Sequence, residues 1–142
     1  MMSQTLHRNV LSHFGRKSRR SRWLTLLYIV ELMSTDVDKS KAFYKELFDW
    51  QYEEMSMPGM NYTIIKVGEG TGGGMMKNPM PGASSMWMPY VLVDDVKAAI
   101  NKAKSLGATV VKDITEVPDM GSFSVITDTT GAMFGLWESK RR

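Results

Sequence analysis

The sequence of 142 residues contains no cysteine and only two histidines. Both of these, His7 and His13, lie in a basic segment at the beginning, so the sequence from about Leu24 onward has neither imidazole nor thiol. A zinc, iron or nickel site in that part would have to use carboxylates and amides alone. A cysteine nucleophile is excluded, and a serine nucleophile would lack a neighbouring histidine as its base.

The sequence also lacks an apolar run near the roughly 20 residues that span a membrane, so we expect a soluble protein without a membrane partner. The apolar run 23–30 is short and is followed by Glu31, which does not fit a secretory signal. The absence of cysteine argues against a disulfide-stapled secreted scaffold, and the cytoplasm is the expected compartment. We expect residues 24–142 to form a single domain.

Positive charge is concentrated in residues 1–23, which contain six of the 18 lysines and arginines and no acidic residue. The whole chain carries +3, so residues 24–142 carry +3 minus +6, or −3. The leader is interpreted as a nucleic-acid arm, a transit-like segment or sequence upstream of the natural start. We favour the last, because the leader has no apolar period of its own. The mildly acidic domain is not expected to bind nucleic acid.

An internal repeat organises the domain. The segment Asp36–Lys39 recurs as Asp95–Ala98, an offset of 59 residues, and each copy follows an apolar run. This pattern predicts a strand, a turn and a helix in each copy. Thr35 or Asp36 in the first copy and Asp94 in the second can cap the helix start. Apolar residues recur at helical spacing in both segments, which predicts amphipathic helices that lie on a sheet.

Three further strand-like stretches, separated by turn residues, follow each helix. Each half therefore reads as β-α-β-β-β, which makes the predicted fold class α+β. The expected boundaries are module 1 at about 26–77, a linker at about 77–86 and module 2 at about 87–138. The expected strands after the helices are 50–57, 62–67 and 74–76 in the first half, and 109–117, 122–127 and 132–137 in the second.

This repeated order, opened by the segment Thr35–Trp50, resembles the vicinal-oxygen-chelate superfamily of glyoxalases, bleomycin resistance proteins and extradiol dioxygenases. The likeness continues at 92–96, 106–108 and 128–131, and is greatest to a branch of glyoxalase-related proteins. The resemblance implies two paired modules that form a half-open, cup-shaped mixed sheet with the helices outside. It also implies a homodimer and, in many members, one divalent metal ion in the cup.

The resemblance also implies where the metal ligands would stand, namely on the first and last strands of each half. Carried onto this chain, the four positions are occupied by Ile29, Gly74, Met88 and Gly135. Isoleucine and glycine offer no donor, and a thioether is a soft, weak ligand for the metals of this superfamily. We therefore expect no metal ion and no cofactor.

The cup should instead be lined by apolar and aromatic side chains around one or two polar groups. If Ile29 and Met88 face inward, strand alternation turns every second neighbour inward as well. A small-molecule pocket has this composition. The candidate ligand-binding residues are Ile29, Glu31, Met33, Met88, Tyr90, Leu92, Met133, Gly135 and Trp137.

Glu31 is the only catalytic candidate, and three roles are open to it. It can meet solvent or pair with a basic residue at a dimer seam, it can contact a ligand, or it can act as a general base. Buried carboxylates are rare unless they are paired, so this residue is the first one to substitute.

Three functions remain open. The first is a metal-free protein that binds a small hydrophobic or aromatic molecule in the cup or at a dimer cleft, as the resemblance to bleomycin resistance proteins implies. The second is an enzyme of the same superfamily, a lyase or a dioxygenase-like protein, that acts on a small carbonyl or oxygenated substrate. The third is an interaction or structural subunit that binds no ligand, in which Trp137 and Met88 would pack across a filled cup.

Overall fold

The computed structural model describes residues 27–140; the predicted leader, residues 1–23, lies outside them. Within residues 27–140, two helices and eight strands follow one another in the order that the repeat predicts. The first half contains β1 (Leu27–Ser34), α2 (Val37–Phe48), β2 (Gln51–Met57), β3 (Met60–Lys66) and β4 (Gly73–Lys77), and the second contains β5 (Met86–Leu92), α3 (Val96–Ser105), β6 (Thr109–Val117), β7 (Gly121–Thr127) and β8 (Met133–Ser139).

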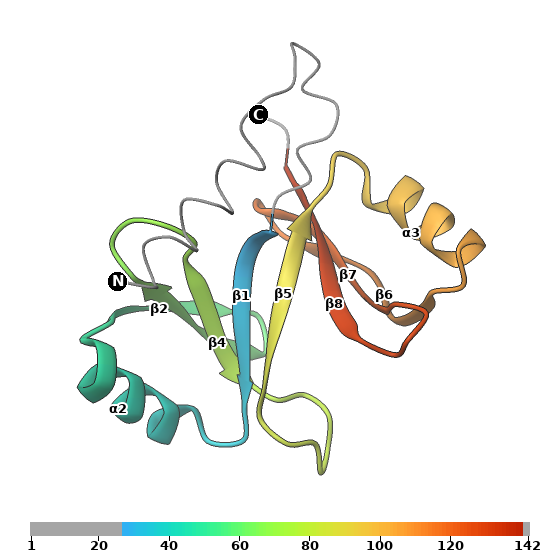
Figure 1. Cartoon of the computed structure of the whole chain (residues 1–142). Coiled ribbons are helices and arrows are strands. Elements are labelled where there is room, and N and C mark those ends of the chain that lie inside the picture. Colours follow the sequence, from blue (N-terminus) through green and yellow to red (C-terminus); the bar gives the residue numbers. More distant parts are fainter. Residues whose placement is uncertain (1–26, 141–142) are drawn as a thin grey trace, which may run out of the picture.

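The eight strands form one mixed sheet in the order β2-β3-β4-β1-β5-β8-β7-β6. At its centre β1 runs antiparallel to β5, and each of these two strands has a parallel neighbour, β4 and β8 respectively. The strand order outward from the centre is therefore the same in both halves. The sheet curls into a half-barrel, with α2 and α3 outside it on opposite sides of the central pair (Figure 1). The predicted α+β, cup-shaped fold is confirmed.

Both helices begin at an aspartate cap. The Asp36 carboxylate accepts a hydrogen bond from Lys39 N at 3.1 Å, and the Asp95 carboxylate accepts one from Ala98 N at 2.9 Å. The cap predicted at Asp36 is confirmed, whereas Asp94 is wrong by one residue, because Asp95 is the extended residue directly before the first helical turn. In the described part of the chain, neither helix is long and apolar enough to cross a membrane.

The two helices bury their apolar faces to different extents. In α3, Val96 and Ile100 are buried against β7 and β8, as the amphipathic pattern predicts. No residue of α2 is buried, although Val37 and Tyr44 pack beside the outer cluster formed by β1, β3 and β4. The prediction of a helix that lies on the sheet by its apolar face is therefore fulfilled by α3 and only in part by α2.

Several large apolar side chains of α2 consequently face outward. Phe43 is 60% exposed, Leu47 56% and Phe48 53%. Tyr44 joins this group to the sheet, since its ring stacks on that of Trp50 at 5.4 Å and meets Trp87 edge-on at 5.5 Å. We call this set the aromatic face of α2; it consists of Phe43, Tyr44, Leu47, Phe48, Trp50 and Trp87.

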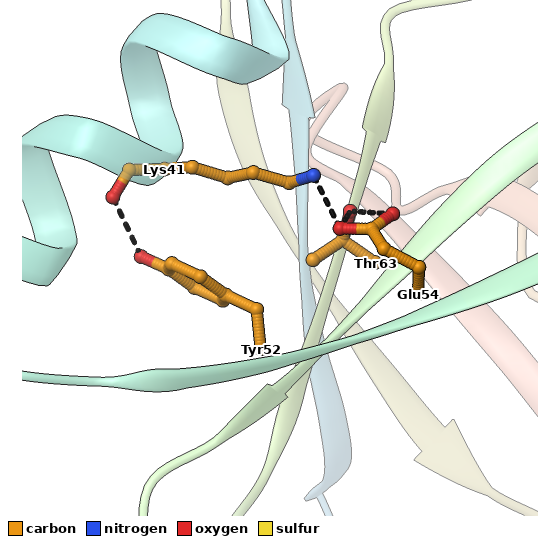
Figure 2. Close-up of polar contacts among 4 residues, drawn as sticks. All are labelled: Lys41, Tyr52, Glu54 and Thr63. Atoms are coloured by element: carbon orange, nitrogen blue, oxygen red, sulfur yellow. Dashed lines mark hydrogen bonds and ion pairs between the residues drawn. The ribbon is translucent and has the colours of Figure 1, made fainter.

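Polar contacts fix α2 to the outside of β2 and β3 (Figure 2). The Lys41 ammonium pairs with the carboxylate of Glu54, and the Tyr52 hydroxyl donates to the carbonyl oxygen of Lys41 at 3.0 Å. The hydroxyl of Thr63, which is buried, donates to Glu54 at 3.1 Å. Although a surface ion pair adds only about 0–1 kcal/mol, the combination orients the helix. These polar contacts add to the packing of Val37 and Tyr44 on the outer face of the sheet.

Strand alternation separates the outer face of the sheet from its inner face. Leu32 of β1 and Met75 of β4 pack on the side of α2, while their neighbours Met33 and Met76 belong to a different cluster. This second cluster also includes Met88 and lines the inside of the half-barrel. We call this inner face the cup.

Candidate functional site

The centre of the cup holds a buried carboxyl group, that of Glu31 in the middle of β1. Glu31 is 7% exposed and lies between Gly74 of β4 and Met88 of β5, which are its partners in the neighbouring strands. The Tyr62 hydroxyl donates to one carboxyl oxygen at 2.8 Å, and the Tyr90 hydroxyl donates to the other at 3.1 Å. The interpretation in which Glu31 meets solvent is therefore wrong.

Two glycines create the space that the tyrosines occupy. A methyl group on Gly74 would overlap the hydroxyl and ring of Tyr62, and one on Gly135 would overlap the ring of Tyr90. Glycine within a strand commonly marks such a close approach. Gly74 and Gly135 are also two of the four positions at which the family resemblance places metal ligands. Tyrosine rings therefore fill the volume that a side chain at either position would need.

The donor set of the cup does not fit a divalent metal ion. Among residues 27–140 there is no group of three or more His, Cys, Asp or Glu residues that could hold a metal ion. Within the described residues, the inner cluster surrounds one buried carboxyl group, that of Glu31, beside two phenol groups and several thioethers. Phenol and thioether groups are poor partners for a hard or borderline dication.

Burial dominates the electrostatics of the site. It raises the pKa of Glu31 above the ordinary value of 4.5, and the hydrogen bonds from Tyr62 and Tyr90 lower this pKa by a smaller amount. Burial and the nearby Glu31 raise the pKa of both tyrosines, so their hydroxyls keep their protons at physiological pH. Tyr62 and Tyr90 are therefore permanent donors, and Glu31 is the group that can change its charge.

The carboxyl group is surrounded by a buried floor and a partly exposed wall. The floor consists of Met33, Met88, Tyr90 and Val125, which are all buried. The wall around it is apolar and partly aromatic, and consists of Ile29, Met76, Met86, Phe123, Met133 and Trp137. The cup therefore presents adaptable methionine side chains and aromatic rings above a packed floor.

The structure brings most of the residues predicted from the sequence together. Glu31 contacts Tyr90, whose ring lies over Gly135, and five more of the predicted residues belong to the same inner cluster. Leu92 is half-buried at the end of β5 and is not a member of that cluster. The five further members are Ile29, Met33, Met88, Met133 and Trp137.

Sequence reasoning missed Tyr62, the second partner of Glu31. A signal for it was available, because Tyr62 alternates with the buried Thr63 along β3 and so faces the cup. Gly74 in the neighbouring strand also indicated that a large group approaches closely. Met76, Phe123 and Val125 were also missed, because the alternation was not followed through them on β4 and β7. Met86 was missed because the alternation on β5 was followed only from Met88 toward Leu92.

A polar hollow of about 310 Å³ lies outside the cup, beside the first turn of α3. Its lining includes Asp95 and Glu138, and both carboxylates accept hydrogen bonds from backbone N–H groups at the start of α3. None of its lining residues belongs to the inner cluster. These carboxylates therefore serve the helix start, and the cup remains the candidate site.

The chain belongs to the glyoxalase/bleomycin resistance protein/dioxygenase superfamily, whose family model matches residues 25–136. This range contains both β-α-β-β-β modules except for the end of β8. The family resemblance drawn from the repeat is thereby confirmed.

Curated relatives are considerably longer than this chain. “Putative glyoxylase CFP32” of Mycobacterium tuberculosis (strain CDC 1551 / Oshkosh) is 35% identical over 107 residues, which cover 75% of this chain and 41% of that protein. “Anthracycline biosynthesis protein DnrV” of Streptomyces peucetius is 26% identical over 122 residues, which cover 75% of this chain and 44% of that protein. The chain thus spans about two fifths of the length of the relatives that it matches.

Solved structures share the fold at low sequence identity. Methylmalonyl-CoA epimerase from Mycobacterium tuberculosis superimposes with a TM-score of 0.66 at 16% identity, over 89% of this chain and 96% of that one. A Streptomyces coelicolor methylmalonyl-CoA epimerase in complex with 2-nitronate-propionyl-CoA gives 0.64 at 14% identity, over 83% of this chain and 99% of that one. At these identities the likeness establishes the fold alone.

The substitution Gly135→Ala tests the close approach of Tyr90. The added methyl group would overlap the Tyr90 ring, so we expect a loss of roughly 1–3 kcal/mol in the free energy of unfolding, typical of an overpacked core. Urea denaturation measures this loss. Gly72→Ala is the matched control, because a methyl group there meets its nearest neighbour, the Ile65 carbonyl oxygen, at an ordinary 3.6 Å. Equal stability of the two variants would contradict the assigned packing.

The substitution Glu31→Gln tests the buried acid through the pH dependence of stability. Because the folded pKa of Glu31 is raised, the folded state holds a proton that the unfolded state releases as the pH rises above about 4.5. The free energy of unfolding of the wild type should therefore fall relative to Glu31→Gln as pH rises through the folded pKa, by about 1.4 kcal/mol per unit of difference.

Urea denaturation at several pH values between 4 and 9 measures this difference. Glu46→Gln is the matched control, since it removes the same charge from an exposed position on α2. A stability difference between the wild type and Glu31→Gln that stays constant with pH would show that Glu31 is not a perturbed acid.

Proposed function

We propose that this protein binds a small apolar or aromatic molecule in the cup without a metal ion. The observation that carries this proposal is the buried Glu31, held by Tyr62 and Tyr90 in the space that metal-binding side chains would otherwise need. Around it the inner face is apolar. Ligand pockets combine such a surface with a few polar groups that fix the orientation of the ligand.

The wall of the cup supplies the contact surface in this proposal. Met86 and Met133 are partly exposed on two different strands, and Trp137 adds an aromatic surface. Because methionine is flexible and polarizable, such a wall adapts to ligands of different shape. The names of two relatives refer to anthracyclines, which are polycyclic aromatic molecules, and this supports the aromatic class of ligand.

A second candidate is an enzyme that uses Glu31 as a proton donor or acceptor on a small carbonyl or oxygenated substrate. The specific observation in its favour is the raised pKa of Glu31, since an acid–base catalyst works best when its pKa is near the operating pH. Glu31→Gln separates the two functions, because it would abolish turnover in the enzyme while leaving apolar contacts in a binding protein intact.

The third possibility, a subunit that binds no ligand, gains some support from the filled floor. Met88 is only 1% exposed and belongs to the same cluster as Trp137. The two functions differ in what happens to the wall of the cup. A ligand would cover the wall in a binding protein, whereas the wall would stay partly exposed in a structural subunit.

Thermal denaturation with neutral aromatic probes tests the proposed binding. We expect 1-naphthol or tert-butylbenzene to stabilise the wild type by an amount that grows with concentration, reaching about 2.7 kcal/mol at a hundredfold excess over Kd. Met133→Glu should abolish the shift by placing a charge in the wall. Met120→Glu is the control, since Met120 is an exposed turn residue outside the cup. A screen of neutral, anionic and cationic aromatic compounds without any shift would favour the non-binding subunit.

We further propose that the chain forms a homodimer through the aromatic face of α2. The internal repeat supports this assignment, because the offset of 59 places Lys102 of α3 where α2 has Phe43. The second module thus folds with a polar residue at this position. The fold itself does not require an exposed phenylalanine there, which leaves contact with a second copy as its proposed role.

The double substitution Phe43→Lys/Leu47→Lys tests the dimer. We expect it to shift the chain from dimer to monomer in sedimentation velocity, because it places two charges in the apolar interface. Leu106→Lys is the control, since Leu106 is the equivalent of Leu47 in the second module and is 67% exposed. A monomeric wild type, or equal behaviour of the two variants, would contradict the proposed interface.

A further inference from the structure

Glu31 lacks a positively charged partner among the described residues. The ion pairs formed within residues 27–140 join Lys41, Lys45, Lys66 and Lys140 to other acids, and none involves Glu31. The groups that hydrogen-bond to its carboxyl are two neutral hydroxyls, from β3 on one side and β5 on the other. A buried carboxylate is normally paired with a cation, and leaving it unpaired is costly.

The carboxyl group also has unused capacity to accept contacts. An ionised carboxylate has about four acceptor sites on its two oxygens. Each oxygen of Glu31 accepts one hydrogen bond, from Tyr62 at 2.8 Å and from Tyr90 at 3.1 Å. The two hydroxyls therefore hold the carboxyl group in place without neutralising its charge.

The aromatic rings around Glu31 are also suited to a positively charged partner. Tyr90 meets Phe123 edge-on at 6.3 Å, and Phe123 is paired with Trp137 in the neighbouring strand. The faces of such rings carry partial negative charge and attract cations, most strongly when the site excludes water. The partly exposed thioethers of Met86 and Met133 add polarizable, uncharged surface to the same cluster.

From these observations we infer that the ligand of the cup is an organic cation, an apolar body that carries a substituted ammonium group close to Glu31. This inference rests on the proposed binding function and specifies its ligand class. An anionic ligand would meet the like charge of Glu31 in a site of low polarity. A small hydrated ion would lose its water to a wall that offers almost no oxygen ligands. An alkylated ammonium ion has little hydration to lose and gains both the carboxylate and the rings.

Three probes of similar size and different charge test this inference on the wild-type protein. They are phenyltrimethylammonium, its neutral carbon isostere tert-butylbenzene, and the anion benzenesulfonate. We expect the cation to bind at least about tenfold more tightly than the neutral isostere, in line with the strength of a desolvated cation–π contact. Benzenesulfonate should bind more weakly than both. Isothermal titration calorimetry measures the affinities at one ionic strength.

Two variants locate the charge that is responsible. Glu31→Gln keeps the shape of the side chain and an oxygen acceptor, so it should remove the preference for the cation and leave the affinity for tert-butylbenzene within about twofold. Glu46→Gln removes the same charge from α2, which packs against the opposite face of the sheet, and should leave the preference unchanged.

The outcomes separate this inference from the function on which it rests. Equal or tighter binding of tert-butylbenzene to the wild type would overturn the cationic ligand class and leave the binding function standing. A cation preference that persists in Glu31→Gln would also overturn the inference, because the charge would then act elsewhere. Absence of binding by all three probes and by 1-naphthol would overturn the inference and the binding function together.

Discussion

The interaction on which the cup depends is the carboxyl group of Glu31, buried between the hydroxyls of Tyr62 and Tyr90. A buried acid is stable only where its oxygens find donors, and here the donors come from both modules. Tyr62 lies on β3 of the first module, and Tyr90 lies on β5 of the second. One polar group therefore ties together strands on both sides of β1. The methionines around it can repack, whereas the three polar residues must keep their mutual positions.

This hydrogen-bond network requires glycine at positions 74 and 135. These are two of the four positions at which the superfamily resemblance places metal ligands. A side chain at Gly74 would displace Tyr62, and one at Gly135 would displace Tyr90. A ligating residue at either position and the present hydrogen bonds therefore exclude each other. The lack of metal-binding side chains and the presence of the tyrosine network are two aspects of one arrangement, in which a carboxyl and two hydroxyls occupy the inner face.

The internal repeat made most of the fold predictable. Because the two modules have the same order of elements, the helix and strand boundaries in one module indicate those in the other. It placed Ile29 and Met88 at equivalent points, and alternation from them led to Glu31 and Tyr90. Tyr62 could not be assigned to Glu31 with the same certainty, since lateral neighbours in a sheet depend on strand order and register. The exposed side of α2 was also unforeseen, because a helical apolar period indicates a face and not what covers that face.

The two modules show which features the fold requires and which it does not. Both modules have a capped helix outside a four-stranded half, and α3 packs on its half through Val96 and Ile100 with the small side chains of Ala99 and Ala103. The aromatic face of α2 is additional, as is the acid in the cup, since the repeat has Tyr90 at the position equivalent to Glu31. Because inward and outward side chains alternate along β1, Glu31 and Leu32 belong to separate environments. Substitutions inside the cup can therefore change ligand recognition without affecting association through α2. Substitutions on α2 can likewise change association without affecting the cup.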